Sequence, residues 1–197
     1  NTFSCTKTME LKIATHKQHK TKEVREIAAS AFQIKNLKDI GCFEEIPETA
    51  DTLQGNALQK ARYVHEHYHV DCFADDTGLE VEALDGRPGV YSARFAGEHC
   101  SYQDNVDKLL KEMEGKNNRK ACFKTVVALI LNDKEYFFEG RVDGVIIENQ
   151  RGTSGFGYDP VFLPEGFEQT FAEMGEEEKN SISHRGRAMR KMIEFLK

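Results

Sequence analysis

Apolar residues along the chain alternate between short strand-like runs and stretches with helical spacing. The run 11–14 is typical of a short strand. Val24, Ile27, Ala28 and Ala31 then recur at i, i+3, i+4 and i+7, which predicts an amphipathic helix. The alternation continues, and the pattern assigns a strand to 32–37, a loop to 41–51, a helix to 52–68 and a strand to 70–74.

The second half of the chain combines one helix with a long hairpin. Two β-like runs, 121–131 and 136–147, flank the turn sequence 132–135, and Gly140 and Gly144 in the second run predict a bulge or twist. A glycine-rich loop over 151–160 and a last helix from about Ser183 follow. A further helix is expected to open at Ser101, with an apolar side made of Tyr102, Val106, Leu109, Leu110 and Met113.

Early strand–helix alternation followed by a late antiparallel hairpin indicates an α/β fold, with a mixed β-sheet flanked by helices. The length of 197 residues fits one domain, or one domain with two lobes. We expect a single domain over 9–197 and a short N-terminal extension over 1–8. The first ten residues lack the apolar core of a secretory signal, and no apolar stretch is long enough to cross a membrane.

Charge and cysteine content narrow the function classes. A net charge of −6 disfavours a general nucleic-acid binder, which usually has a basic face, but leaves room for a local basic site. The five cysteines are odd in number, widely spaced and without a CxxC pair. We therefore expect a reducing cytoplasmic location rather than a disulfide framework or a zinc ribbon.

Asp75 and Asp76 form an acidic pair directly after the predicted strand 70–74. Acids are costly to place at the end of a buried strand, and adjacent carboxylates repel each other unless a cation or a proton intervenes. Mg²⁺ suits such a pair, because it prefers oxygen ligands and binds together with substrate phosphates. A solvated turn whose aspartates cap the next segment fits the pair equally well.

Two polar segments earlier in the chain could complete a phosphate and metal site. The loop 15–20 joins a predicted strand to a predicted helix, so Thr15 and Lys20 could bind phosphate, although no Walker sequence is present. Asn56 and Lys60 share one helix face, and Glu48 in the acidic loop before them could join the aspartate pair at a metal. Taken alone, each segment fits an ordinary polar surface better.

Two later segments are suited to a planar or anionic ligand. Glycines on both sides of Phe156 allow close backbone approach, and Phe156 or Tyr158 could stack on a base, although a tight turn with core aromatics is the alternative. Lys179 and the pair His184 and Arg185 at a helix start suit an anion or a carbonyl oxygen, or form a basic surface. A metal site at residues 65, 67 and 69 is disfavoured, because no HExxH motif is present.

Four motifs in this order resemble the inosine/xanthosine triphosphate pyrophosphatase family. They are ADDTGL at 74–79, PGVYSAR at 88–94, GFGYDP at 155–160 and SHRG at 183–186, and the resemblance runs from about 11 to 196. It implies an elongated fold of two lobes with a central substrate cleft, a homodimer and a Mg²⁺ cofactor. It also implies hydrolysis of aberrant purine nucleoside triphosphates (ITP, dITP and XTP) to the monophosphate and pyrophosphate, which cleanses the nucleotide pool.

The resemblance also implies roles for single residues. Asp76 is implied as catalytic base and, with Glu48, as metal ligand, and Asp75 is implied as an auxiliary metal residue beside it. Thr15 and Lys20 match the triphosphate-binding loop. The other implied substrate-binding residues are Asn56, Lys60, Thr77, Phe156, Gly157, Tyr158, Asp159, Lys179, His184 and Arg185.

The chain departs from the family pattern at two positions. Lys17 stands where the family usually has Asn, which leaves open an extra phosphate contact or a neutral surface change. Pro47 replaces an acid found before Glu48 in some members, so a nearby acid is an alternative metal ligand. Two other functions stay open, a pyrophosphatase for pyrimidine or modified triphosphates and a nucleotide-sensing protein without turnover.

Overall fold

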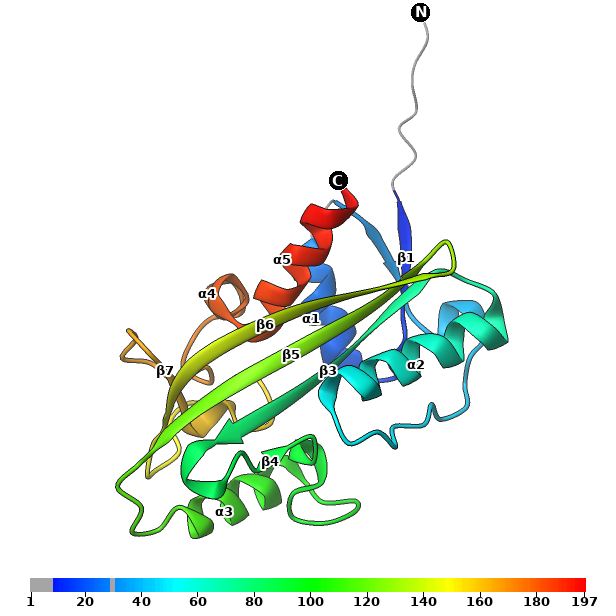
Figure 1. Cartoon of the computed structure of the whole chain (residues 1–197). Coiled ribbons are helices and arrows are strands. Elements are labelled where there is room, and N and C mark those ends of the chain that lie inside the picture. Colours follow the sequence, from blue (N-terminus) through cyan, green and yellow to red (C-terminus); the bar gives the residue numbers. More distant parts are fainter. Residues whose placement is uncertain (1–8, 29–30) are drawn as a thin grey trace, which may run out of the picture.

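The computed structural model describes residues 9–28 and 31–197, and the expected extension over 1–8 lies outside them. Within these ranges, seven strands form one sheet in the order β2-β1-β3-β5-β6-β7, and β4 pairs with β3 beside this path (Figure 1). The strands are β1 Glu10–Ile13, β2 Gln33–Lys35, β3 Cys72–Val81, β4 Pro88–Gly89, β5 Lys120–Leu131, β6 Lys134–Ile146 and β7 Phe162–Pro164.

In the described part of the chain, five α-helices flank this sheet. They are α1 Gln18–Ala28, α2 Leu53–Tyr68, α3 Tyr102–Glu112, α4 Glu176–Ile182 and α5 His184–Leu196, joined by short 3₁₀ turns that include η3 Ser92–Arg94 and η4 Asp159–Val161. Because β1 pairs in parallel with β2 and β3, whereas β3, β5, β6 and β7 pair antiparallel, the sheet is mixed. The α/β fold class predicted from the sequence is confirmed. Within the described ranges, no helix has both the length and the apolar character needed to cross a bilayer.

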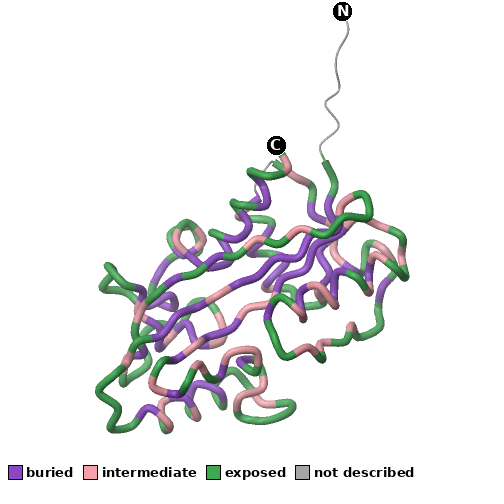
Figure 2. Tube along the Cα trace, in the orientation of Figure 1, coloured by how far each residue is buried: buried purple, intermediate pink, exposed green. Residues whose placement is uncertain are grey.

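The first lobe is built around α1, α2 and α5. Successive residues of β3 face opposite sides of the sheet, so this lobe has a separate core on each side. Phe73 packs with Leu11 and Met189 beneath α1 and α5, whereas Ala74 packs with Ala57 beneath α2. Figure 2 shows long buried stretches, in purple, along the central strands of the sheet.

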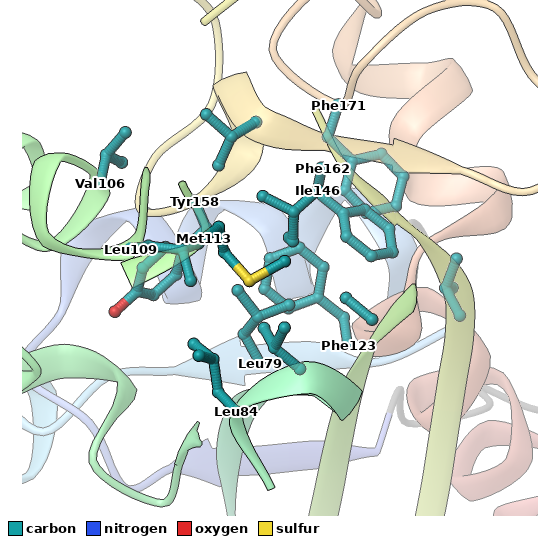
Figure 3. Packing of buried hydrophobic residues seen from close by; sticks show 14 of the residues in the cluster. Leu79, Leu84, Val106, Leu109, Met113, Phe123, Ile146, Tyr158, Phe162 and Phe171 are labelled. Atoms are coloured by element: carbon teal, nitrogen blue, oxygen red, sulfur yellow. The ribbon is translucent and has the colours of Figure 1, made fainter. Parts of the chain in front are cut away.

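A third core lies at the other end of β3 and β5. It supports the second lobe, which is the part of the structure around α3 and β7. Leu79 and Phe123 pack there with Leu109 of α3 and with Phe162 of β7 (Figure 3). The polar residues 75–77 lie in β3 between this core and the two cores of the first lobe. The two lobes therefore meet at the polar residues 75–77 of β3, and this junction is the seam between them.

Several elements differ from the sequence prediction for identifiable reasons. The expectation that Asp75 and Asp76 follow the end of a strand was wrong, because β3 continues through both and pairs them with Val127 and Val126 of β5. Helix α1 begins at Gln18, so Lys20 belongs to a helix rather than to the predicted loop. Helix α4 and strand β7 were not predicted, because both are short and lack a clear apolar period.

Gly140 and Gly144 allow close packing rather than a bulge. The pairing of β5 with β6 is continuous through both positions. A Cβ atom at Gly140 would meet the backbone oxygen of His184 at 2.0 Å, and one at Gly144 would meet that of Leu163 at 2.4 Å. The glycines thus let α5 and β7 approach β6, and at Gly140 this brings the start of α5 toward the seam.

Candidate active site

A cleft opens at this seam, and both lobes contribute to its walls. Strand β3 forms its floor, the start of α1 and the loop before α2 form one side, and η3, α3 and the loop before η4 form the other. The lining includes most of the residues singled out from the sequence: Lys20, Glu48, Asn56, Asp76, Thr77, Phe156, Gly157, Tyr158, Asp159, Lys179, His184 and Arg185.

Asp75 anchors the cations of this site from within the sheet. Its side chain is buried, with Oδ1 accepting from Lys20 Nζ at 3.0 Å and Oδ2 accepting from Arg185 Nε at 2.7 Å. Burial alone would raise its pKa, but the charges of Lys20, Arg185 and Lys60 outweigh burial and hold the pKa well below its usual range. Asp75 is thus a buried carboxylate with both oxygens used by basic side chains.

Asp76 lies on the opposite face of β3 and lines the cleft. Its Oδ2 accepts from Asn56 Nδ2 at 3.3 Å. Burial raises the pKa of Asp76, Lys60 and Lys20 oppose the rise, and the nearby Glu48 adds to it. Asp76 therefore faces the cleft with less charge compensation than Asp75, and a second carboxylate is close by.

Helix α2 places Lys60 and Asn56 on the face that meets β3. Lys60 Nζ donates to the backbone oxygen of Asp75 and contacts Glu48 Oε1, both at 2.6 Å. Asn56 Oδ1 accepts from the backbone N–H of Ala50 at 2.8 Å, which ties the loop carrying Glu48 to the helix. Burial raises the pKa of Glu48, but the charge and hydrogen bond of Lys60, together with the charges of Lys20 and Lys17, lower it overall. Glu48 is thus held as a carboxylate beside Asp76.

Lys20 is a buried cation close to other cations. Burial and the charges of Lys60 and Arg185 lower its pKa, Asp75 opposes them, and the net result is a pKa of about 8. Lys60 and Arg185 are also paired with Glu48 and Glu23, so the buried cations are compensated by more than one carboxylate. Lys17, Lys20, Lys179 and Arg185 nevertheless all line the cleft, and this concentration of basic side chains favours an anionic ligand.

Phe156 is presented to the cleft by a turn that requires glycine. Gly155 has φ 75, and a Cβ atom there would meet Asp159 Oδ2 at 2.2 Å. The same oxygen accepts from the Phe156 N–H at 3.0 Å and from Lys179 Nζ at 2.8 Å. Lys179 Nζ lies over the Phe156 ring, 4.5 Å from its centroid. Asp159 therefore holds together the turn, the ring and the lysine.

His184 and Arg185 enter the cleft from the first turn of α5, which Ser183 caps by accepting from the N–H of Gly186. The His184 ring stacks on Phe123 at 4.6 Å between centroids. Burial, with Arg185 and Lys179 nearby, places the pKa of His184 well below its usual range, so the ring is neutral near pH 7. Among the described residues, its buried Nδ1 has no hydrogen-bond partner.

Three of the predicted residues do not line the cleft directly. Asp75 and Lys60 act from behind its wall through the contacts above, whereas Thr15 Oγ1 accepts from the N–H of Lys17 at 3.2 Å and shapes the loop. Lys17 is exposed and lines the cleft, and so does His19. The histidine at 65 bonds to Val70 and Asp133 at the end of α2 and is not part of the site.

Sequence patterns did not identify Glu23, His19 or Tyr102 as residues of the site. Glu23 is buried, with Oε2 at 3.1 Å from an Arg185 nitrogen and 3.9 Å from Lys179 Nζ. It follows Lys20 by three residues on the same helix face, a signal that could have placed both in one charge network. Tyr102 was expected in the core but is 48% exposed and lines the cleft.

The carboxylates of the cleft fit a hard divalent cation that also binds substrate. Glu48 and Asp76 both line it, and Mg²⁺ commonly uses one or two carboxylates together with substrate phosphates. Among the described residues, no group of three His, Cys, Asp or Glu side chains converges as a complete protein cage. The donor set therefore suits a metal that arrives with phosphate rather than a permanently enclosed ion.

The chain is similar to proteins of one family over nearly its whole length. The model of the Ham1 family matches residues 11–195. A Porphyromonas gingivalis protein named dITP/XTP pyrophosphatase is 56% identical over 188 residues, with 95% of this chain and 97% of that protein covered. A Flavobacterium psychrophilum protein of the same name is 52% identical, with 96% and 100% covered.

Solved structures of similar proteins have the same fold over nearly the whole chain. The Staphylococcus aureus Ham1 protein superposes with a TM-score of 0.86 at 34% identity, and 95% of this chain and 97% of that chain are covered. A nucleoside-triphosphatase, also titled dITP/XTP pyrophosphatase, from Mycobacterium abscessus has a TM-score of 0.75 at 38% identity, with 93% and 98% covered.

Proposed function

The chain belongs to the Ham1 family, and on that premise we propose that it hydrolyses noncanonical purine nucleoside triphosphates (ITP, dITP and XTP) to the monophosphate and pyrophosphate. The observation that carries this proposal is that Lys20, Glu48 and Asp76 line the same cleft as Phe156, while Lys60 holds Glu48 from behind the wall. The polyphosphate and the base of one nucleotide can thus be bound in the same cleft. We further propose that 9–197 act as a single catalytic domain.

In the proposed reaction, water breaks the anhydride link between the α- and β-phosphates. Asp76 orients the water and takes its proton, as its place in the cleft beside the amide of Asn56 allows. Lys20 and Lys60 stabilise the negative charge of the phosphates and of the leaving pyrophosphate. Thr15 and Lys17 shape the loop that receives the phosphate chain.

We propose Mg²⁺ as the cofactor, held by Glu48 and Asp76 together with substrate phosphates. When bound, the ion would offset the charge of the triphosphate and polarise the phosphoryl group. Asp75 was predicted as an auxiliary metal residue, but its two oxygens are used by Lys20 and Arg185. We therefore propose a positioning role for Asp75, which fixes the two cations relative to the cleft.

Base selection is proposed to depend on donors at the start of α5 and near η4. A donor aimed at the 6-oxo group of hypoxanthine or xanthine is left unpaired by the 6-amino group of adenine, and this can discriminate strongly. His184, Arg185 and the backbone N–H groups near Tyr158 are the candidates, and Tyr158 is itself fixed by donating to the Ser92 oxygen at 2.6 Å.

Turnover of four triphosphates tests this function. With Mg²⁺ present, we expect kcat/KM for ITP and XTP to exceed that for ATP by at least about 100-fold, because adenine leaves a buried donor unpaired. GTP should also be slow, since its 2-amino group must be excluded. Pyrophosphate release measured for each nucleotide decides the matter. Equal rates on all four would contradict the proposal, and preference for a pyrimidine triphosphate would favour the alternative enzyme.

A homodimer is also proposed, as the family resemblance implies. The outward face of β6 carries Phe137 and Val145, 38% and 37% exposed, with Glu139, Arg141 and Asp143 between them, so the proposal rests on the family rather than on an apolar patch. Sedimentation velocity of the purified chain should give about twice the mass of one 22.4 kDa chain. The mass of a single chain at working concentration would remove this proposal. A cytoplasmic location stays a prediction from the cysteine pattern.

A further inference from the structure

Three aromatic rings from three separate elements meet at the mouth of the cleft. His19 comes from the first turn of α1, Tyr102 is the first residue of α3, and Phe156 lies in the loop before η4. The His19 and Phe156 centroids are 4.1 Å apart, and the Tyr102 centroid is 6.2 Å from each of them. The rings thus connect the helix that carries Lys20 with the helix of the second lobe.

Their place along the cleft corresponds to the nucleoside rather than to the phosphates. His19 directly precedes Lys20, which is proposed to bind phosphate, and its ring contacts that of Phe156, which is proposed to stack on the base. Burial and the positive charges of Arg185, Lys20 and Lys17 lower the pKa of His19 to about 4. A neutral imidazole contributes a flat ring for stacking and adds no charge for phosphate.

The rings also leave too little room for a nucleotide in this conformation. The cleft encloses about 100 Å³ of free space, below the roughly 300 Å³ at which small-molecule sites begin. A base between two rings needs about 7 Å, or two carbon contact distances of about 3.5 Å. The 4.1 Å between His19 and Phe156 and the 6.2 Å between Tyr102 and Phe156 are both shorter.

We propose that His19 and Tyr102 are base-binding residues that form an aromatic clasp with Phe156, opening to admit the base and stacking around it once it is bound. This inference rests on the proposed nucleotide substrate. Tyr102 is 48% exposed at the start of its helix, so its side chain has room to swing outward. The clasp contacts the base of the nucleotide and leaves its phosphates to Lys20 and Lys60.

Single substitutions separate this role from a structural one. His19→Ala and Tyr102→Ala are each expected to raise KM for ITP about 5- to 100-fold, the usual effect of removing a base-stacking ring, with little change in kcat. Inhibition by inorganic tripolyphosphate, which has no base, should be unchanged. His19→Phe and Tyr102→Phe, which keep a flat ring, should restore most of the affinity.

The matched controls are His67→Ala, an exposed histidine of α2 outside the cleft, and Tyr91→Ala, an exposed tyrosine of the second lobe outside the cleft. Neither should change KM. An unchanged KM in both clasp variants would overturn the proposal. An equal loss of affinity for ITP and tripolyphosphate would also overturn it, because that result would indicate a phosphate contact or a general defect of the cleft.

A direct binding signal is available because the chain contains no Trp. In Tyr102→Trp, the single indole should change its emission when IMP is titrated in, and should not respond to pyrophosphate. Tyr91→Trp should respond to neither. No change with saturating IMP would overturn the clasp. If the unmodified chain released no pyrophosphate from ITP or XTP while Tyr102→Trp still responded to IMP, the clasp would stand and the proposed activity would fall.

Discussion

The substitution Asp76→Asn is expected to lower turnover of ITP with Mg²⁺ by about 10²- to 10⁴-fold, the usual contribution of a general base. The amide keeps the shape of the carboxylate and can still accept from Asn56, whose Nδ2 lies 3.3 Å from Asp76 Oδ2. It can neither take a proton from water nor offer a charged oxygen to a metal. The fold should therefore be preserved while the chemical step is lost.

Steady-state pyrophosphate release measures this effect, and a thermal melt verifies that the variant is folded. Asp71→Asn is the matched control, because Asp71 directly precedes β3 but bonds to the N–H of Asn132 at the far end of the strand. It should keep normal turnover. Turnover of Asp76→Asn within a few-fold of the unmodified chain would remove Asp76 from the mechanism.

The neighbouring substitution Asp75→Asn is expected to act mainly on stability. Asp75 is 3% exposed and compensates Lys20 and Arg185, which are 5% and 1% exposed. Removing one partner of a buried ion pair leaves an uncompensated charge and costs about 3–5 kcal/mol. We expect the free energy of unfolding, measured by urea denaturation, to fall by about this amount.

Asp51→Asn is the control for Asp75→Asn, because Asp51 lies exposed in the loop before α2. Its free energy of unfolding should stay within about 0.5 kcal/mol of the unmodified chain. A bound triphosphate should restore part of the stability lost in Asp75→Asn, since its phosphates also compensate Lys20. An Asp75→Asn variant as stable as the unmodified chain would show that the buried charge network is not held by this carboxylate.

The contrast between these two aspartates shows what the sequence could and could not predict. Residue types and order were sufficient to place Asp75 and Asp76 at a charged site, but the apolar run before them indicated the end of a strand. In the structure, pairing with β5 continues the strand, so the two side chains face opposite sides of the sheet. That pairing determines that Asp75 contacts the buried cations and that Asp76 lines the cleft. It depends on β5, which is distant in the chain, so the sequence around the two aspartates does not reveal it.

Local patterns succeeded where a single element decides the outcome. Helix α2 follows its cap Thr52 and ends at Tyr68 as predicted, and it places Asn56 and Lys60 on one face. Contacts between distant segments were missed. Tyr102 has the spacing of a core residue of α3, yet the curl of the sheet brings the start of this helix beside His19, far away in the chain. Exposed aromatic residues and helix starts of this kind have no periodic signal that distinguishes a cleft from a core.

The most direct test of the central claim is to identify the products formed from ITP by the unmodified chain, with Mg²⁺ and with a chelator in its place. If carboxylates and lysines of one cleft bind the metal and the triphosphate for cleavage between the α- and β-phosphates, phosphorus NMR should show equal amounts of IMP and pyrophosphate, and the chelator should stop the reaction. Formation of IDP and phosphate, or equal rates without the metal, would contradict the account.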